Sequence, residues 1–575
     1  MSFQIKSIFT ILFTLQAVAF HQNARSQSTT AANIQVDFNN EKAKMNPIWA
    51  WFGYDEPNYT YMKDGKKLLS ELAALSPVPV YVRAHNLLTS GNGEAAFKWG
   101  STNAYTEDAN GKPVYNWKIM DSIMDTYIQR GMKPLAEFSF MPEALSTKPQ
   151  PYRHTWQPGQ PYSNINTGWR FPPKDYKKWG DLCFEWVRHS VERYGEKEVE
   201  SWYWELWNEP DAAYWGGTVE EFNKLYDYTV DGATRALPSI RIGGPHVTGG
   251  ISPAATRFLK TFLEHCISGT NYVTGKTGTR IDFIGFHAKG SPSLVGNMVR
   301  MNAGLQLRQI EGAFKIIASY PQIKNLPIVI GESDPEGCAA CGMTTNPSNA
   351  YRNGTMYSSY TAATFARKYE LAQKLGVNLI GAVSWSFEFE DQPWFHGFRD
   401  LATNGVDKPV LNVFRMYGKM GGMLVEAKSD RMYSLDSALV PTANNSNRGS
   451  FRGAATDIGA LASKDKKSSA VMVWNYHDDD KQGPAENVSL TLNGISKKKV
   501  TMTQYRIDGE HSNSYEVWKK MGSPQNPSPD QIDQLEKAGK LQTIGSPQIM
   551  RIKNKTSTVQ MTLPRQAVAL IKLDW

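Results

Sequence analysis

The sequence predicts a (β/α)8 barrel followed by an antiparallel β-sandwich. Between about residues 45 and 415, short apolar segments alternate with amphipathic segments. This alternation favours parallel strands joined by crossover helices. After about residue 424 the helical pattern gives way to strand-like runs separated by polar turns, which is typical of a sandwich. The chain of 575 residues is also longer than one ordinary domain.

Eight segments of the first region have the character of barrel strands, because each is short, apolar and separated from the next by a helical stretch. They lie at residues 48–52, 78–83, 133–138, 201–207, 240–244, 282–287, 327–332 and 379–385. Clear helices between them are predicted at residues 175–194, 219–235, 303–319 and 358–375. Eight such units predict a closed TIM-type barrel with its active site at the carboxyl ends of the strands.

The remaining segments complete a four-part organisation. Residues 1–26 are interpreted as a signal peptide, since Lys6 precedes a short apolar run at residues 8–20. Small residues at 17–19 fit a cleavage site, and a cut near residues 24–27 is the alternative. Residues 27–44 contain a strand that we expect to join the sandwich. The barrel is assigned to residues 45–420 and the sandwich to residues 421–575, with a short helix at 531–538 inserted between its strands. The mature protein is therefore expected to be soluble, in the periplasm or outside the cell.

The composition is that of a folded globular protein, with 41% hydrophobic and 21% charged residues. It is rich in aromatic residues, with 17 Trp, 26 Tyr and 24 Phe. Flat rings with a polar edge suit stacking against sugars, so the excess favours a carbohydrate cleft. The net charge of +8 is spread out and forms no basic block typical of nucleic-acid binding. An acidic polysaccharide would be tolerated or attracted.

The most informative motif is Trp207-Asn208-Glu209-Pro210, which closes a predicted strand. Proline has no N–H and a fixed φ, so the strand must stop there and leave Glu209 at its end. The segment at residues 327–332 likewise ends in Glu332. Two carboxylates at the carboxyl ends of two buried strands predict the acid and nucleophile pair of a glycosidase.

Other predicted strands end in functional groups as well. Arg83 and His85 follow the second strand, His287 and Lys289 the sixth, and Trp385 ends the eighth. Polar groups at five strand ends form a pattern that structural needs alone do not require. We therefore expect one carbohydrate site at this end of the barrel.

Six segments of the chain resemble glycoside hydrolase family 39, the family of β-xylosidases and α-L-iduronidases. They are residues 53–58, 82–86, 133–143, 207–211, 282–287 and 331–334. The resemblance covers nearly the whole mature chain, although in the sandwich it is only architectural. It implies a retaining mechanism on a (β/α)8 barrel, with Glu209 as general acid/base and Glu332 as nucleophile.

Further roles follow from this resemblance and from the chemistry of the side chains. Arg83 is expected to keep Glu332 ionised through charge and hydrogen bonds. Asn208 is expected to bind the sugar 2-hydroxyl, a contact that tightens in the transition state. His85 and His287 are expected to bind or orient hydroxyl groups, and the alternative for each is a structural histidine.

Trp385 is expected to form the apolar floor under the sugar, with plain core packing as its alternative. Cys338 and Cys341 have CxxC spacing, but no second CxxC or His pair accompanies them, so a local disulfide is favoured over zinc. No metal, nucleotide or other cofactor is predicted, because no ligand cluster or phosphate-binding loop is recognised. The weaker site candidates are Glu143, Asp391 and His396.

The identity of the sugar depends on Lys289. The segment 287–290 resembles the iduronidase version of the family, in which a lysine can pair with a uronate carboxylate, and Asp334 with its following proline points the same way. The loop at residues 392–398 instead resembles the xylosidases. A lysine at this strand end could also pair with Glu332 or Asp334 and never contact a substrate.

The leading hypothesis is a secreted retaining exo-glycosidase of the β-xylosidase type, acting on plant or algal polysaccharide fragments. One alternative is a uronidase-type exo-glycosidase that uses Lys289 for the carboxylate. An alternative of another class is a non-catalytic carbohydrate-binding barrel, which the intact pair of Glu209 and Glu332 argues against. A redox protein that uses Cys338 and Cys341 is a remote further alternative, since no thioredoxin-like context surrounds them.

Overall fold

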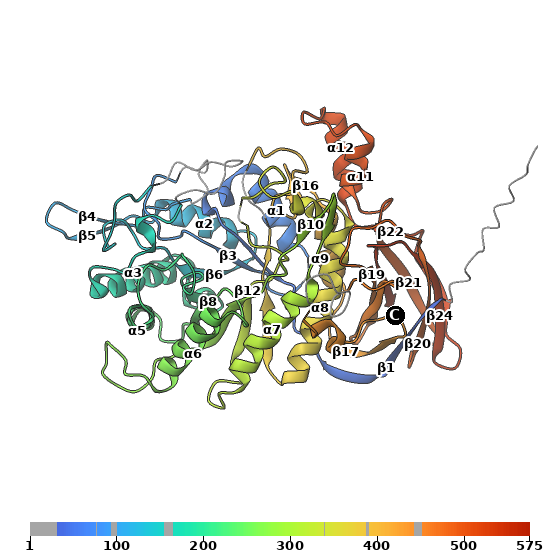
Figure 1. Cartoon of the computed structure of the whole chain (residues 1–575), viewed down its shortest axis with the longest axis horizontal. Coiled ribbons are helices and arrows are strands. Elements are labelled where there is room, and N and C mark those ends of the chain that lie inside the picture. Colours follow the sequence, from blue (N-terminus) through green and yellow to red (C-terminus); the bar gives the residue numbers. More distant parts are fainter. Residues whose placement is uncertain are drawn as a thin grey trace, which may run out of the picture.

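The computed structural model describes residues 31–75, 77–93, 100–153, 165–338, 340–386, 390–441 and 451–575. The predicted signal peptide at residues 1–26 lies outside these residues. The described chain forms a parallel barrel and, beside it, a mostly antiparallel sheet (Figure 1). The predicted fold class is therefore confirmed.

The barrel is built from parallel strands that follow one another around the ring in chain order. The eighth strand is interrupted at Val383: its first part, β13, pairs with β12, and its second part, β14, pairs with β2 and closes the ring. The strands are β2 (Trp51–Tyr54), β3 (Tyr81–Ala84), β6 (Lys133–Phe138), β7 (Tyr203–Leu206), β8 (Ile242–Val247), β9 (Phe283–His287), β12 (Pro327–Glu332), β13 (Asn378–Ala382) and β14 (Ser384–Trp385). The predicted boundaries differ from these by at most three residues at either end.

Helices surround the barrel strands, as crossover connections require. The sequence explains where several of them begin: Asp175 caps α3, and Thr218 and Glu221 form a capping box at the start of α5. The helices of the barrel are α1 (Lys63–Ala73), α2 (Lys118–Ile128), α3 (Tyr176–Tyr194), α4 (Glu196–Val199), α5 (Val219–Ala236), α6 (Pro253–Ser268), α7 (Ala303–Ala318), α8 (Thr355–Leu375) and α9 (Pro409–Tyr417), with 3-10 turns at Pro57–Tyr61, Gly168–Arg170 and Pro347–Arg352.

Three short hairpins decorate the barrel loops, and the sequence pattern did not predict them. They are too short for an alternating pattern to stand out. They consist of β4 (Tyr105–Glu107) with β5 (Pro113–Tyr115), β10 (Ser293–Val295) with β11 (Met298–Arg300), and β15 (Ala402–Thr403) with β16 (Val406–Asp407).

The second sheet contains strands from both ends of the described chain. Strand β1 (Ala32–Lys44) pairs antiparallel with β17 and parallel with β20, so it lies among C-terminal strands (Figure 1). Alternate residues of β1, β20 and β24 pack with those of β19 and β25 into one apolar core. The remaining elements are β17 (Met423–Ser429), α10 (Leu435–Leu439), β18 (Asp457–Lys464), β19 (Ser468–Tyr476), β20 (Glu486–Asn493), β21 (Lys499–Ile507), β22 (Gln542–Thr543), β23 (Gln548–Arg551), β24 (Thr556–Leu563) and β25 (Val568–Asp574).

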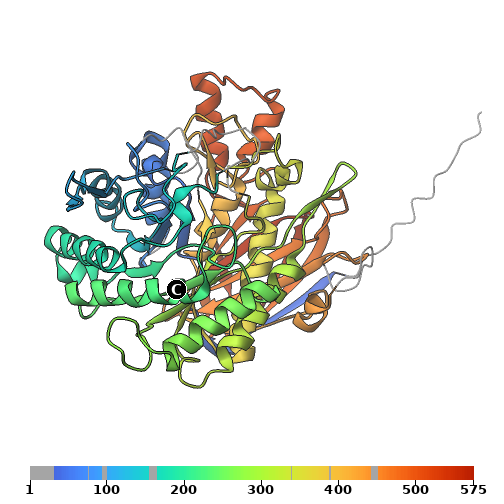
Figure 2. The same ribbon diagram turned by 60° about the vertical axis from the view of Figure 1, so that its left-hand side comes forward.

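The two bodies are joined through α8, which is buried on nearly every side because it lies between the barrel and β19. A helical pair inserted after β21, α11 (Ser514–Lys520) and α12 (Pro529–Gly539), stands apart from the sandwich strands (Figure 2). It packs against the barrel loop at Trp394 and Phe395. The sequence predicted α12 but not the short α11. Among the described residues, no helix combines the length and apolar character that a membrane crossing requires.

Candidate active site

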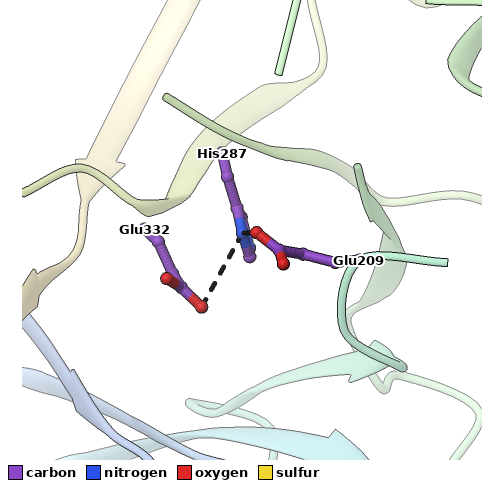
Figure 3. A group of neighbouring side chains, drawn as sticks. All are labelled: Glu209, His287 and Glu332. Atoms are coloured by element: carbon purple, nitrogen blue, oxygen red, sulfur yellow. Dashed lines mark hydrogen bonds and ion pairs between the residues drawn. The ribbon is translucent and has the colours of Figure 1, made fainter. Parts of the chain in front are cut away.

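The two predicted catalytic carboxylates converge at the carboxyl ends of the barrel strands. Glu332 ends β12, His287 ends β9, and Glu209 follows β7. Figure 3 shows Glu209 and Glu332 entering from opposite sides and pointing toward His287. One oxygen of each carboxylate and one ring nitrogen of His287 all lie within 4.8 Å of one another. Such close oxygens are compatible with the roughly 5–5.5 Å between the carboxyl groups of retaining glycosidases.

The backbone near Glu209 turns sharply before the proline is reached. Strand β7 ends at Leu206, and both Trp207 and Glu209 adopt left-handed backbone angles, with φ of 67° and 46°. The N–H of Glu209 donates to the carbonyl oxygen of His246 at 3.0 Å. Left-handed non-glycine residues are uncommon and gather at functional sites. This turn aims the Glu209 side chain across the strand ends toward Glu332.

The surroundings of Glu209 favour its protonated form. Burial raises the pKa of Glu209, and the nearby charge of Glu332 raises it further, to about 7. Its Oε1 atom lies 2.9 Å from Nδ1 of His287. Burial holds the pKa of His287 well below its usual range, so this imidazole is neutral. A carboxyl group that keeps its proton near neutral pH can act as a general acid.

The surroundings of Glu332 favour the ionised form. Its Oε2 atom lies 2.6 Å from Arg399 Nη2 and 2.8 Å from Lys289 Nζ. Its Oε1 atom lies 3.4 Å from both Arg83 Nη1 and His85 Nε2. Burial acts to raise the pKa of Glu332, but the charges of Lys289 and Arg399 outweigh it and hold the pKa well below its usual range. Glu332, the predicted nucleophile, is therefore charged and held at both oxygens.

Arg83 is the centre of a buried network beneath the catalytic pair. Its Nε donates to Glu205 at 2.5 Å, and its Nη2 lies 2.8 Å from Glu137 and 3.2 Å from the amide oxygen of Asn208. The structure thus brings Arg83 to Glu332, as expected, and it orients Asn208 as well. Sugar binding by Asn208 stays a prediction.

His85 contributes a positive charge near the nucleophile. Its Nδ1 lies 2.9 Å from Glu137. Burial acts to lower the pKa of His85, but the charge of Glu137 outweighs it and raises the pKa to about 9. The second ring nitrogen faces Glu332. A contact of His85 with a sugar hydroxyl stays a prediction.

Lys289 pairs with two carboxylates of the site, which is the alternative raised for it from the sequence. Its Nζ lies 2.6 Å from Asp334 and 2.8 Å from Glu332. Asp334 is also held by Arg399 through two contacts of 2.7 Å each. The Lys289 side chain keeps 16% of its surface exposed, whereas that of Arg399 keeps 2%. Lys289 is thus the cation of this cluster that solvent can reach.

Trp385 has no exposed surface in this arrangement. Its Nε1 donates to Asp55 at 3.2 Å, and the guanidinium of Arg399 lies 4.2 Å from the ring centroid. A cation over an aromatic face is stabilised by the ring quadrupole. The indole therefore supports Arg399, and the expected floor under a sugar stays a prediction.

The weaker candidates contact other residues or lie at the surface, and the loop cysteines are bonded. Among the described contacts, Glu143 binds Gln150 and His396 binds Thr344, while Asp391 is exposed. Cys338 and Cys341 form a disulfide, as their spacing predicts.

The group formed by Glu209, His287 and Glu332 is compact enough to hold a cation. The charges of Lys289 and Arg399 beside Glu332 oppose one.

Several residues of the site were missed from the sequence. Glu137 and Glu205 lie inside strands whose other core residues are mostly apolar. A charged residue inside a buried strand is uncommon, so their positions could have indicated that they belong to the site. Arg399 follows the last barrel strand in an irregular loop, where no periodicity indicates which side chain turns inward. His246 lies in β8 after a Gly-Gly-Pro segment that hides the strand pattern.

Comparison with known proteins agrees with this geometry. Residues 32–553 match the sequence model of glycosyl hydrolases family 39. A β-xylosidase of Caldicellulosiruptor saccharolyticus is 26% identical over 433 residues, which are 73% of this chain and 76% of that protein. An α-L-iduronidase of Mus musculus is 25% identical over 390 residues, 62% of this chain and 56% of that protein.

Among solved structures, a monomeric β-xylosidase from Caulobacter crescentus CB15 shares the fold, with a TM-score of 0.72 and 20% identity over 95% of this chain and 99% of that one. The family match covers most of the chain, and its range includes Glu209 and Glu332. The chain belongs to glycosyl hydrolases family 39 and is a glycoside hydrolase.

Proposed function

We propose that this chain is a retaining exo-glycosidase of the β-xylosidase type, exported from the cell, that releases terminal sugars from polysaccharide-derived oligosaccharides. One observation carries the proposal: Glu209 and Glu332 lie together while their pKa values are displaced in opposite directions. When the surroundings move the pKa values of two carboxyl groups apart in this way, one group can serve as acid and the other as nucleophile.

In the first step, ionised Glu332 attacks the anomeric carbon of the terminal sugar. Glu209 donates its proton to the glycosidic oxygen, so the bond to the leaving group breaks as the ester bond to Glu332 forms. Lys289 and Arg399 bind Oε2 of Glu332 and fix the orientation of the carboxylate.

In the second step, Glu209 is a carboxylate and takes a proton from water. The water attacks the anomeric carbon, the ester bond breaks, and Glu332 returns to its ionised form. Neutral His287 suits both steps, because its Nδ1 accepts from a carboxyl or donates to a carboxylate according to its tautomer.

A neutral terminal sugar is favoured by the pairing of the two cations beside the nucleophile. Lys289 and Arg399 already contact both Glu332 and Asp334. Their charges are thus compensated within the protein and do not require a charged substrate. The β-xylosidase that matches 73% of this chain supports the same substrate class.

A uronidase-type activity is the second candidate, and the exposure of Lys289 favours it. Its side chain keeps 16% of its surface accessible beside Arg399, so a uronate carboxylate could share the two cations with Asp334. The α-L-iduronidase similarity is consistent with this candidate.

The test is hydrolysis of aryl glycosides by the purified mature chain, with Glu332→Ala as control. The panel contains a β-xyloside, a β-glucuronide, an α-L-iduronide and an α-L-arabinoside. The proposal expects turnover of the β-xyloside that the control loses. Turnover confined to a uronide would establish the second candidate, and a wild-type rate equal to that of Glu332→Ala on every member would overturn both.

Lys289→Met separates the two candidates further. With a xyloside as substrate, the variant should lose kcat, since Lys289 acts there through Glu332. With a uronide, it should lose kcat in the same way and also raise KM, because a substrate contact is lost as well. A matched Lys289→Arg variant keeps the charge.

The export part of the proposal is supported by the signal-like segment at residues 1–26. Expression of the full chain in a Gram-negative host, followed by fractionation and N-terminal sequencing, tests it. Cleavage after the apolar run with activity outside the cytoplasm is expected. An unprocessed cytoplasmic product would refute it.

A further inference from the structure

His246 connects the supports of both catalytic carboxylates. It lies in β8, and its carbonyl oxygen accepts the backbone N–H of Glu209 at 3.0 Å. Its ring Nε2 lies 2.5 Å from Oε2 of Glu205. Neither His246 nor Glu205 has any exposed surface. His246 therefore contacts two things: the turn that orients Glu209, and Glu205, the carboxylate beneath Glu332.

Glu205 transmits this contact to Glu332 through Arg83. Its second oxygen, Oε1, accepts from Arg83 Nε at 2.5 Å. The opposite end of the same guanidinium reaches Glu332 at 3.4 Å and Asn208 at 3.2 Å. A guanidinium is planar and rigid, so fixing its Nε edge also fixes the direction of its other nitrogens.

The next two strands around the barrel, β9 and β12, leave space for the His246 imidazole. A Cβ atom on Gly285 of β9 would lie 2.2 Å from the His246 ring, and one on Gly331 of β12 would lie 2.2 Å from its Nδ1. Any larger residue at either position would displace the ring. The backbone of His246 is itself left-handed, with φ of 55°, which few residue types adopt readily.

We propose that His246 is a positioning residue that fixes both catalytic carboxylates at once, Glu209 through its backbone carbonyl and Glu332 through Glu205 and Arg83. The inference rests on the proposed glycosidase function. It predicts that loss of the ring contact lowers kcat more than it raises KM, because Arg83 holds Glu332 and also Asn208, whose expected contact with the sugar 2-hydroxyl tightens in the transition state. A displacement of about 1 Å can lower a rate by roughly 10²-fold.

The test compares two substitutions that differ in reach. His246→Asn tolerates the left-handed backbone but is too short to reach Glu205. His246→Gln places an amide nitrogen near the position of Nε2 and should restore the contact. We expect His246→Asn to lower kcat by about 10–100-fold with little change in KM, and His246→Gln to recover most of the loss.

His265→Asn is the matched control. His265 is also a buried histidine that contacts a carboxylate, with its Nε2 2.9 Å from Asp227, but the pair joins α6 to α5. This variant should lose stability without a selective loss of kcat. Thermal unfolding of all three variants separates folding defects from positioning defects.

The inference is overturned if the kcat of His246→Asn is no lower than that of His265→Asn. It is also overturned if His246→Gln has the same low kcat as His246→Asn although the two variants are equally stable to heat. A wild-type enzyme inactive on the whole glycoside panel would instead refute the proposed function. Crystal structures of His246→Asn and His246→Gln then decide the inference alone: displaced Arg83 and Glu205 in the Asn variant support it, and unmoved side chains overturn it.

Discussion

Arg399 holds Glu332, the proposed nucleophile, at the carboxylate oxygen that Arg83 does not contact. Its Nη2 lies 2.6 Å from Oε2 of Glu332, whereas Arg83 approaches Oε1. Arg399 is itself held by two contacts to Asp334 and by the face of Trp385. The guanidinium cannot turn away without losing these partners, so Glu332 keeps both its charge and its orientation.

This arrangement predicts a bell-shaped pH profile of kcat/KM. Glu209 must be protonated, so activity should fall as the pH rises through about 7, the pKa to which burial and Glu332 raise it. Glu332 must be ionised, and because Lys289 and Arg399 lower its pKa, the acid limb should lie below the usual range of a glutamate. Values of kcat/KM across the pH range with an oligosaccharide, whose leaving oxygen needs the proton of Glu209, measure both limbs. An alkaline limb unchanged in Glu209→Gln would contradict the assignment.

Glu209→Ala should affect substrates according to their leaving groups. A general acid contributes about 10²–10⁴-fold when the leaving oxygen needs a proton, and little when the leaving group is a good anion. The loss should therefore be large for a natural oligosaccharide and small for cleavage of a dinitrophenyl glycoside. The comparison uses kcat/KM on both substrates, because kcat/KM reports the first step and not the later attack of water, with purified variant and wild type. Equal losses on both would place the acid elsewhere.

Arg399→Met should weaken the nucleophile. It removes a charge 2.6 Å from Glu332, so the acid limb of the pH profile should move to higher pH and kcat/KM should fall by about 10²-fold. Arg399→Lys keeps the charge but loses the forked contact with Asp334, so its acid limb should move less. If Met and Lys variants behave alike, the geometry of the fork matters rather than the charge.

The residues at the ends of regular strands were the predictable part of the site. Parallel strands bring their carboxyl ends to one edge of the barrel, so the sequence alone predicts that Glu209, His287 and Glu332 lie together. Their sequence positions fall where an apolar run stops, which is visible in one sequence. The barrel itself followed from the same alternation of strands and helices.

The contacts that set the charge of the site were not predictable. Arg399 reaches Glu332 from an irregular loop 67 residues away in sequence, and no periodic pattern describes such a loop. Trp385 was placed at the right strand end, but the guanidinium that lies over its ring comes from that same loop. The ring of His246 is accommodated by Gly285 and Gly331 on other strands, a relation that exists only in three dimensions.

The last prediction concerns the joint between the barrel and the sandwich. Arg367 of α8 contacts Asp457 of β18 at 2.8 Å, and both side chains are fully buried. Asp457 also accepts from Trp474 Nε1 at 2.8 Å. Arg367→Met would leave the Asp457 charge buried without its cation, which should lower the free energy of unfolding by about 3–5 kcal/mol.

Lys374→Met is the matched control on the same helix, because Lys374 pairs with Asp436 at the exposed surface. Surface pairs of this kind contribute little, so this variant should unfold like the wild type. Denaturant unfolding of both variants, followed by tryptophan fluorescence, measures the difference. Equal stability of the two variants would show that the Arg367 contact is not what joins the two bodies, and would shift that role to the apolar packing of α8 against β19.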